Sequence, residues 1–166
     1  MPETAQDYIA RMLSNADGQD GLAILAETPG RLKALLDTSP PASWRQRPAP
    51  GRWSAGEVLA HLADAEIVTG WRVRSILASN GTPLQAFDQD EWADAFKYSE
   101  VDPSEALQTF TAARTSLLSL LERVDPLRHT HHGLHAERGQ ETIGHLIRLY
   151  AGHDINHLKQ IEALVT

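Results

Sequence analysis

The sequence contains no cysteine among its 166 residues, which excludes disulfide bonds, thiolate metal ligands and a cysteine nucleophile. It also lacks an apolar run of about 18 residues, the length that a membrane-spanning helix requires. Its first residues, Met1, Pro2 and Glu3, lack the basic start of a secretion signal. We therefore expect a protein of the cytoplasm that does not associate with a membrane.

The sequence also has fewer basic than acidic residues. Lysine and arginine number 15 against 22 aspartate and glutamate residues, so the formal net charge is -7. Nucleic acid and anionic membranes attract positively charged surfaces, so neither is an expected partner. Histidine, with eight copies, is the residue that stands out.

Apolar residues recur at helical spacing along most of the chain and predict an all-α fold. The length suits a single domain, residues 1–166. We expect a four-helix bundle with short extra helices, in an up-and-down or crossover arrangement. Helical patterns cover about residues 5–13, 20–38, 54–80, 102–125 and 141–164, with loops over 39–52 and 128–140, and no segment predicts a strand.

Local signals set the expected helix boundaries. Ser54 and Glu57 form a capping-box pattern, and Asp102 followed by Pro103 is a second helix start. Thr28 and Pro29 show the same N-cap and proline pattern, so we expect the segment 20–38 to break there into two helices. The link 80–102 is long enough for a crossover or a further short helix.

Two histidines of the last helix lie on its apolar stripe. His153 and His157 are four residues apart and share a face with Leu146, Tyr150 and Ile161. Their Cβ atoms should lie about 5–6 Å apart, and each buried imidazole needs a donor and an acceptor. A shared metal ion would use one nitrogen of each ring. The alternative is two core histidines with separate hydrogen bonds.

His61 lies on the flank of the apolar stripe of the helix that follows Ser54, and Asp64 is placed to orient it. Packed helices lie about 8–10 Å apart, so His61 can be a third ligand. His145 falls outside the stripe of its helix. The acidic residues Glu66, Asp88, Asp90 and Asp154 are candidates for hydrogen bonds to ligands, although such residues mostly form solvated faces.

Five segments carry a resemblance to a known family: Arg52-Trp53-Ser54, Glu57 to Glu66, Phe87 to Trp92, His135 to Gly139, and Tyr150 to Ile161. Over about residues 20–164 the chain resembles the DinB/YfiT-like superfamily, four-helix-bundle proteins with a three-histidine metal site. The resemblance implies that His61, His153 and His157 are metal ligands. One departure is His135-Ala136-Glu137, where YfiT-like members have His-Pro-Glu.

The resemblance also implies an activity. The ion would be divalent, Zn²⁺ or Ni²⁺, with an open position that activates water or binds a thiol as thiolate. Similar proteins include thiol transferases that use low-molecular-weight thiols and proteins described as metal-dependent hydrolases. We thus expect attack by a thiol or by water on a small electrophilic substrate, and a homodimer, since related bundles often pair.

The histidine-rich segment 128–140 precedes the helix that carries the paired histidines. Within it, His135 and Arg138 are candidates to assist catalysis, as a proton shuttle or by holding a substrate carboxylate. The alternative for this segment is a solvated polar loop. The alternative for the whole protein is a non-catalytic, stress-associated metal-binding bundle that dimerises and holds a structural ion.

Overall fold

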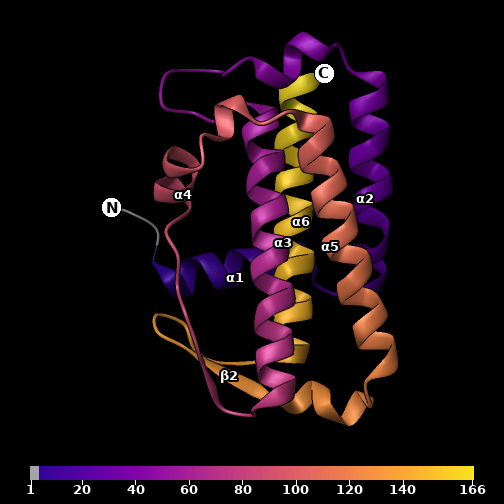
Figure 1. Ribbon diagram of the computed structural model, residues 1–166, viewed down its shortest axis with the longest axis vertical. Helices are drawn as coiled ribbons and strands as arrows, with labels where there is room; N and C mark the ends of the chain where they lie inside the picture. Colours follow the sequence, from indigo (N-terminus) through magenta and orange to yellow (C-terminus); the bar gives the residue numbers. More distant parts are fainter. Residues whose placement is uncertain (1–3) are drawn as a thin grey trace.

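The computed structural model describes residues 4–166, and four long helices form its main body (Figure 1). These are α2 (Gly21–Thr38), α3 (Ala55–Ala78), α5 (Pro103–Arg123) and α6 (Ile143–Val165). Figure 1 shows α2 and α6 running toward the end that holds the C-terminus, and α3 and α5 running the opposite way. The helices α3 and α5 are consecutive and parallel, so the link between them crosses the bundle lengthwise. The predicted helical bundle is confirmed, and its topology is the crossover alternative.

Shorter elements surround the bundle. The helix α1 lies across it, and α4 stands apart from it on the long link (Figure 1). The 3-10 helices are labelled η. The bounds are α1 (Ala5–Asn15), η1 (Pro41–Arg45), β1 (Thr82–Leu84), α4 (Gln89–Ala95), η2 (Tyr98–Glu100), η3 (Pro126–Thr130), β2 (His132–His135) and β3 (Gly139–Thr142).

The helix starts expected from local signals are present. Ser54 accepts a hydrogen bond from the Glu57 amide, and the Glu57 carboxylate accepts one from the Ser54 amide. Asp102 accepts from the Ser104 amide at the start of α5. Each cap satisfies amides that have no partner within their helix, which is why the sequence alone locates these boundaries.

The predicted break at Thr28 and Pro29 is wrong, because α2 is one continuous helix. Proline has no amide hydrogen, so Pro29 leaves the carbonyl of Leu25 without its helical donor. That carbonyl accepts a hydrogen bond from Arg114 of α5 at 2.7 Å instead. A side chain 89 residues away thus supplies the hydrogen bond that the proline removes.

The expectation that no strand forms is also wrong, because β1, β2 and β3 form a small sheet. The strand β1 pairs parallel with β2, aligning Thr82 with Gly133, and β2 pairs antiparallel with β3, aligning His135 with Gly139. Strands of three or four residues are too short to show an alternating pattern, and β1 finds its partner only through tertiary contact. Part of segment 128–140 is therefore a hairpin. The hairpin ends at Thr142, which is the N-cap of α6. This helix therefore begins at Ile143, two residues later than expected.

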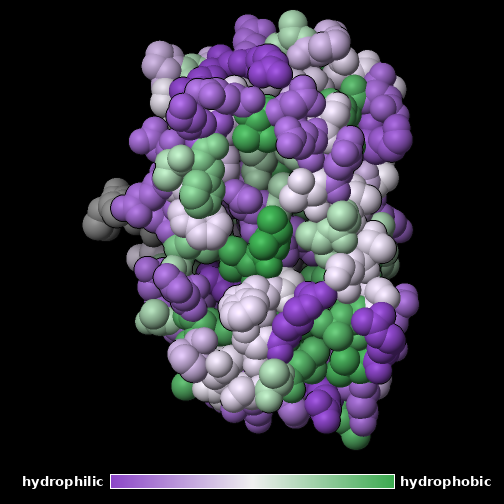
Figure 2. Space-filling model, in the orientation of Figure 1, coloured by the Kyte–Doolittle hydropathy of each residue, from purple (hydrophilic) through white to green (hydrophobic). Residues whose placement is uncertain are grey.

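Buried apolar side chains fill the space between the four helices, among them Leu32, Val58, Phe110 and Ile161. On the face shown in Figure 2, hydrophobic residues occur in separate patches between polar ones. Exposed large side chains include Ile67 and Trp71, one turn apart on α3. Within residues 4–166, no helix combines the length and the apolar character needed to cross a membrane.

Candidate metal site and adjoining cavity

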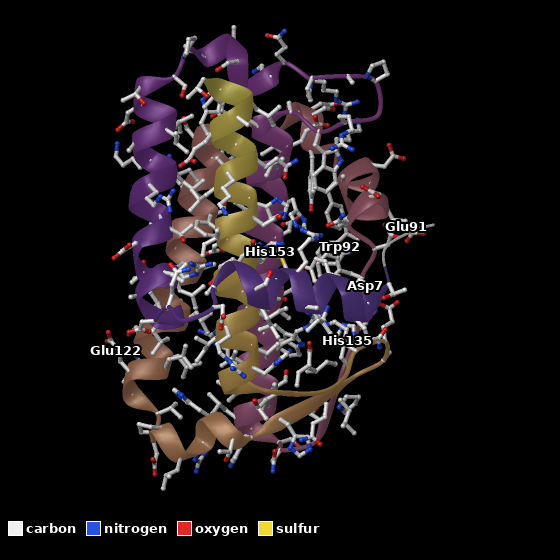
Figure 3. The ribbon with its side chains drawn as sticks, turned by 180° about the vertical axis from the view of Figure 1, so that it is seen from behind. Asp7, Glu91, Trp92, Glu122, His135 and His153 are labelled. Carbon is white, nitrogen blue, oxygen red and sulfur yellow. The ribbon has the colours of Figure 1, made fainter. Side chains whose placement is uncertain are left out.

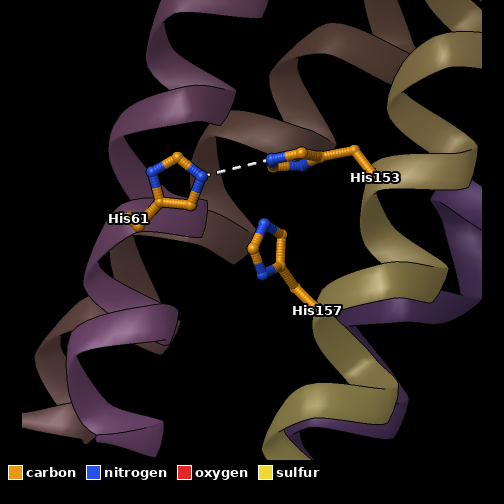
Figure 4. A group of neighbouring side chains, drawn as sticks. All are labelled: His61, His153 and His157. Atoms are coloured by element: carbon orange, nitrogen blue, oxygen red, sulfur yellow. Dashed lines mark hydrogen bonds between the residues drawn. The ribbon is translucent and has the colours of Figure 1, made fainter. Parts of the chain in front are cut away.

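Three histidines from two helices converge inside the bundle. His61 extends from α3, and His153 and His157 extend from α6 toward it (Figure 4). One ring nitrogen of each lies within 4.8 Å of the others, and the Nε2 atoms of His61 and His153 are 3.2 Å apart. The structure therefore brings together the three residues that the sequence singles out.

Burial keeps these imidazoles neutral. It lowers the pKa of His61 to about 3, with a smaller contribution from His157. It lowers the pKa of His157 to about 4, although the hydrogen bond to Gln160 acts in the opposite direction. Burial also lowers the pKa of His153, well below its ordinary value. A neutral imidazole has one nitrogen lone pair, which is what a metal ion binds.

A hydrogen bond orients the ring of His157. Its Nδ1 lies 2.9 Å from Oε1 of Gln160, one turn further along α6. The amide oxygen can only accept, so the ring hydrogen is on Nδ1 and the lone pair is on Nε2. Metal-binding histidines are commonly held in this way by a second hydrogen bond.

The cluster fits a divalent cation. Zinc binds imidazole nitrogen at about 2.0–2.1 Å, which places two ligands of a tetrahedral ion about 3.4 Å apart. The separation of 3.2 Å between the Nε2 atoms of His61 and His153 is close to this value. The remaining nitrogen of His61, Nδ1, is buried without a hydrogen-bond partner among the described residues, so this ring lacks a second hydrogen bond of the kind that orients His157.

The expectation that Asp64 orients His61 is wrong. Its carboxylate accepts a hydrogen bond from the hydroxyl of Tyr98 at 2.6 Å and does not orient His61. The indole ring of Trp53 packs against His61 instead, with ring centroids 5.3 Å apart. His145 lies away from the cluster, with Nε2 3.9 Å from a carboxylate oxygen of Glu141.

A cavity of about 370 Å³ adjoins the cluster, and His61 and His153 form part of its wall. The rest of the wall comes from α1, the segment 86–89, the hairpin of β2 and β3, and further residues of α3 and α6. Figure 3 shows α1 crossing α6 near the level of His153, with His135 and Trp92 on the side away from α2. The cavity is large enough for a small molecule.

The hairpin places both candidates from segment 128–140 on the cavity wall. Nδ1 of His135 accepts from the amides of Glu137 and Arg138 at 3.2 and 3.3 Å. The guanidinium of Arg138 donates two hydrogen bonds to the buried carboxylate of Glu141, at 2.7 and 3.0 Å. Arg138 is thus already paired within the hairpin. Of the two residues, His135 is therefore better placed to contact a molecule in the cavity.

Two residues of the cavity wall, Arg72 and Tyr150, are not among the site residues predicted from the sequence. Arg72 lies on the buried face of α3, only 2% exposed, and its Nη1 donates to the Tyr150 hydroxyl at 3.0 Å. A charged residue in the apolar stripe of a helix was the available signal, because buried charges need a specific partner.

Acidic residues were expected to lie mostly on solvated faces, and this is wrong for two of the four candidates. Glu66 and Asp154 are 2% and 1% exposed, and both accept hydrogen bonds from the buried Arg114 of α5. Asp88 instead caps α4 through the amides of Asp90 and Glu91, and Asp90 is exposed. Arg114, Glu66 and Asp154 thus form a buried ion triad inside the bundle. Asp154 is the residue that follows His153.

Comparison with known proteins identifies the fold. The solved structure of YfiT from Bacillus subtilis, described as a probable metal-dependent hydrolase with an unusual four-helix bundle topology, matches with a TM-score of 0.80. The match has 21% identity and covers 87% of this chain and 83% of that one. The structure therefore belongs to a class of helical bundles that has the fold of YfiT.

The family follows from the sequence comparison. The model of the DinB superfamily matches residues 24–161, and this chain belongs to that family. A protein of Oceanobacillus iheyensis, named "Putative metal-dependent hydrolase", is 30% identical over 69% of this chain and 66% of its own length, just under two thirds. YfiT of Bacillus subtilis, with the same description, is 21% identical over 86% of this chain and 81% of its own.

Proposed function

We propose that the protein is a divalent-metal-dependent enzyme in which His61, His153 and His157 hold the ion. The reaction is attack by water or by a low-molecular-weight thiol on a small electrophilic substrate. The observation that carries the proposal is the convergence of three buried, neutral imidazoles, of which those of His61 and His153 line a cavity of about 370 Å³. The names of the similar proteins, as metal-dependent hydrolases, support it at the family level.

Zn²⁺ and Ni²⁺ are the proposed ions, and either supplies Lewis acidity that lowers the pKa of water or a thiol in its open position. The protein contributes the surroundings. Gln160 keeps the lone pair of His157 on Nε2, and His135 contacts the substrate from its place on the cavity wall. Arg138 acts indirectly, because its pairing with Glu141 holds the hairpin in place.

The cavity favours catalysis over the alternative of a structural ion. A structural metal site is closed, with all its ligands supplied by the protein. Here only three ligands converge among the described residues, and two of them, His61 and His153, face a cavity of substrate size. The stress-associated structural bundle has no such observation in its favour.

Metal content tests the proposal directly. Protein purified without a nickel column should contain about one equivalent of Zn²⁺ or Ni²⁺ per chain, measured by elemental analysis. His153→Ala should lose most of this metal, because two imidazoles remain. His145→Ala is the matched control on the same helix and should keep it. Stoichiometric metal in a variant without His61, His153 and His157 would contradict the proposal.

Nucleophile choice needs a separate assay. We expect metal-loaded protein to release nitrophenolate from para-nitrophenyl acetate faster than His153→Ala does, with N-acetylcysteine as the added thiol. Release that depends on the thiol identifies a transferase, and equal release without it identifies a hydrolase. Equal rates for loaded protein and His153→Ala in both arms would count against an enzyme.

Three further expectations stay predictions. We propose that residues 1–166 work as one domain, since α1 packs against the bundle through contacts such as Asn15 to the carbonyl of Gly152. We also propose a homodimer, for which Ile67 and Trp71 offer exposed apolar surface. We propose a cytoplasmic location on the composition alone, which includes no cysteine.

A further inference from the structure

Arg72 is a buried cation without an anionic partner. It is 2% exposed, and none of the ion pairs among residues 4–166 includes it. Its hydrogen bonds go to neutral acceptors, the Tyr150 hydroxyl at 3.0 Å and the carbonyl of Gln85 at 2.6 Å. Its buried Nε has no partner, as is also the case for the Nε of Arg114. Buried charges are normally paired or neutralised, so this arrangement is costly unless something else supplies the negative charge.

Other arginines of this protein show the usual solution. Arg114, 1% exposed, pairs with both Glu66 and Asp154. Arg138, on the same cavity wall as Arg72, pairs with Glu141. Arg72 differs from both in that it lines the cavity and has no carboxylate. The place for a negative charge is therefore the cavity itself.

A second donor lies beside Arg72. Nε2 of His135 is 3.4 Å from an Nη atom of Arg72. Because Nδ1 of His135 accepts from two backbone amides, the hydrogen of the neutral ring is on Nε2. Burial and the nearby Arg138 and Arg72 lower the pKa of His135, which agrees with a neutral ring. Two N–H groups then stand side by side with no acceptor between them.

Tyr150 provides a third donor. Its hydroxyl oxygen accepts from Arg72, so its own hydrogen is available to an acceptor in the cavity. The two acidic residues of the cavity wall, Asp88 and Glu137, do not compensate the positive charge of Arg72. The carboxylate of Asp88 accepts from the amides at the start of α4, and Glu137 is exposed. The Arg72 wall, meaning Arg72, His135 and Tyr150, is thus rich in donors and poor in acceptors.

We propose that the Arg72 wall binds the carboxylate of a small anionic substrate. A guanidinium presents a planar fork that matches a carboxylate, and the donors of His135 and Tyr150 complete the site. Arg72 follows His61 by eleven residues, three helical turns on the same face of α3. The substrate therefore carries its carboxylate at one end and its reacting group at the other. This inference rests on the proposed function, in which the histidine cluster is the reactive centre.

The test measures binding of para-fluorobenzoate to the protein as isolated, by fluorine NMR titration. The neutral isostere para-fluorobenzamide is the ligand control. We expect saturable binding of the benzoate and at least about tenfold weaker binding of the amide, since the amide has no negative charge to pair with Arg72 and presents N–H donors to a wall of donors. Equal affinity for both ligands would overturn the inference.

Variants locate the site. Arg72→Gln should weaken benzoate binding at least about tenfold. Arg74→Gln is the matched control: Arg74 lies two residues away on α3, donates to the Gly70 carbonyl and Ser116, and is absent from the cavity wall. Tyr150→Phe keeps the ring and loses the donor, so it should weaken benzoate binding by a smaller factor. This variant tests the site if Arg72→Gln does not fold. Unchanged benzoate affinity in Tyr150→Phe and in folded Arg72→Gln would overturn the inference.

Removal of metal by a chelator separates this inference from the proposed function. Benzoate binding that survives chelation and is lost in Arg72→Gln supports the Arg72 wall. Binding that is lost on chelation and unchanged in Arg72→Gln places the carboxylate on the metal, which overturns the inference and leaves the proposed function standing. If elemental analysis finds no metal while Arg72 still controls benzoate binding, the proposed function fails and the anion site remains.

Discussion

Replacement of Arg114 by methionine is expected to lower the free energy of unfolding by about 3–5 kcal/mol, because it leaves charges buried without their partner. The guanidinium donates to Glu66 at 2.8 Å and to both carboxylate oxygens of Asp154 at 2.7 and 3.2 Å. It also satisfies the carbonyl of Leu25. Chemical denaturation at neutral pH measures the loss.

The deficit of Arg114→Met should depend on pH. Burial raises the pKa of Glu66 and of Asp154, and Arg114 opposes this shift in both. Without Arg114 both folded-state pKa values rise further above their unfolded values. A carboxyl whose folded pKa is raised favours the folded state below the unfolded pKa and loses that stability as the pH rises. The variant should therefore be closest to the wild type near pH 5 and furthest from it near pH 8.

Two controls define what the triad contributes. Arg31→Met removes a half-exposed pair with Glu162 and should cost about 0–1 kcal/mol. The triple variant Arg114→Met, Glu66→Met and Asp154→Leu should recover much of the loss, since apolar side chains can replace a buried ion cluster. A single variant Arg114→Met as stable as the wild type would refute this account.

Gly152→Ala is the second change for which we expect a large effect. At Gly152 of α6 the helix α1 approaches so closely that an added Cβ would lie 2.6 Å from the carbonyl carbon of Met12 and closer still to its oxygen. The obstacle is backbone, so α1 must move. Overpacking of this kind costs about 1–3 kcal/mol, occasionally more. Denaturation and hydrogen exchange of the α1 amides measure the change.

The same helix offers a control for the glycine substitution. An added Cβ at Gly144 would have its nearest neighbour at 3.6 Å, an ordinary contact. Gly144→Ala should therefore be neutral or slightly stabilising, since alanine favours a helix more than glycine does. Because Thr4, Ala5 and Tyr8 line the cavity, the displacement of α1 in Gly152→Ala should also weaken benzoate binding. Equal stability of the two variants would show that α1 tolerates the methyl group.

Predictions from the sequence succeeded where the cause is local. The caps at Ser54 and Asp102 act within three residues of the chain, so the sequence shows both the donor and the acceptor. The stripe that contains His153 and His157 follows from helical geometry alone. Both histidines are buried on α6, as that stripe requires.

Predictions failed where a partner is distant in the chain. Pro29 is a helix breaker by the local rule, yet α2 is continuous, and the carbonyl that Pro29 leaves without a donor is satisfied by Arg114 of another helix. The strands β1 and β2 pair across about fifty residues of sequence. Asp64 is near His61 in sequence, yet it bonds to Tyr98, 34 residues further on.

The sequence by itself determined the helical class of this protein, most of its helix boundaries and the helix face that each of the three histidines occupies, because those depend on spacing and on hydrogen bonds within one turn. The tertiary structure alone decided the parallel course of α3 and α5 and the meeting of His61 with His153. It also decided the contrast between Arg114, which pairs with two carboxylates, and Arg72, whose acceptors are neutral. Those outcomes depend on which distant segments pack together, since the partner that satisfies a buried charge or carbonyl lies on another element.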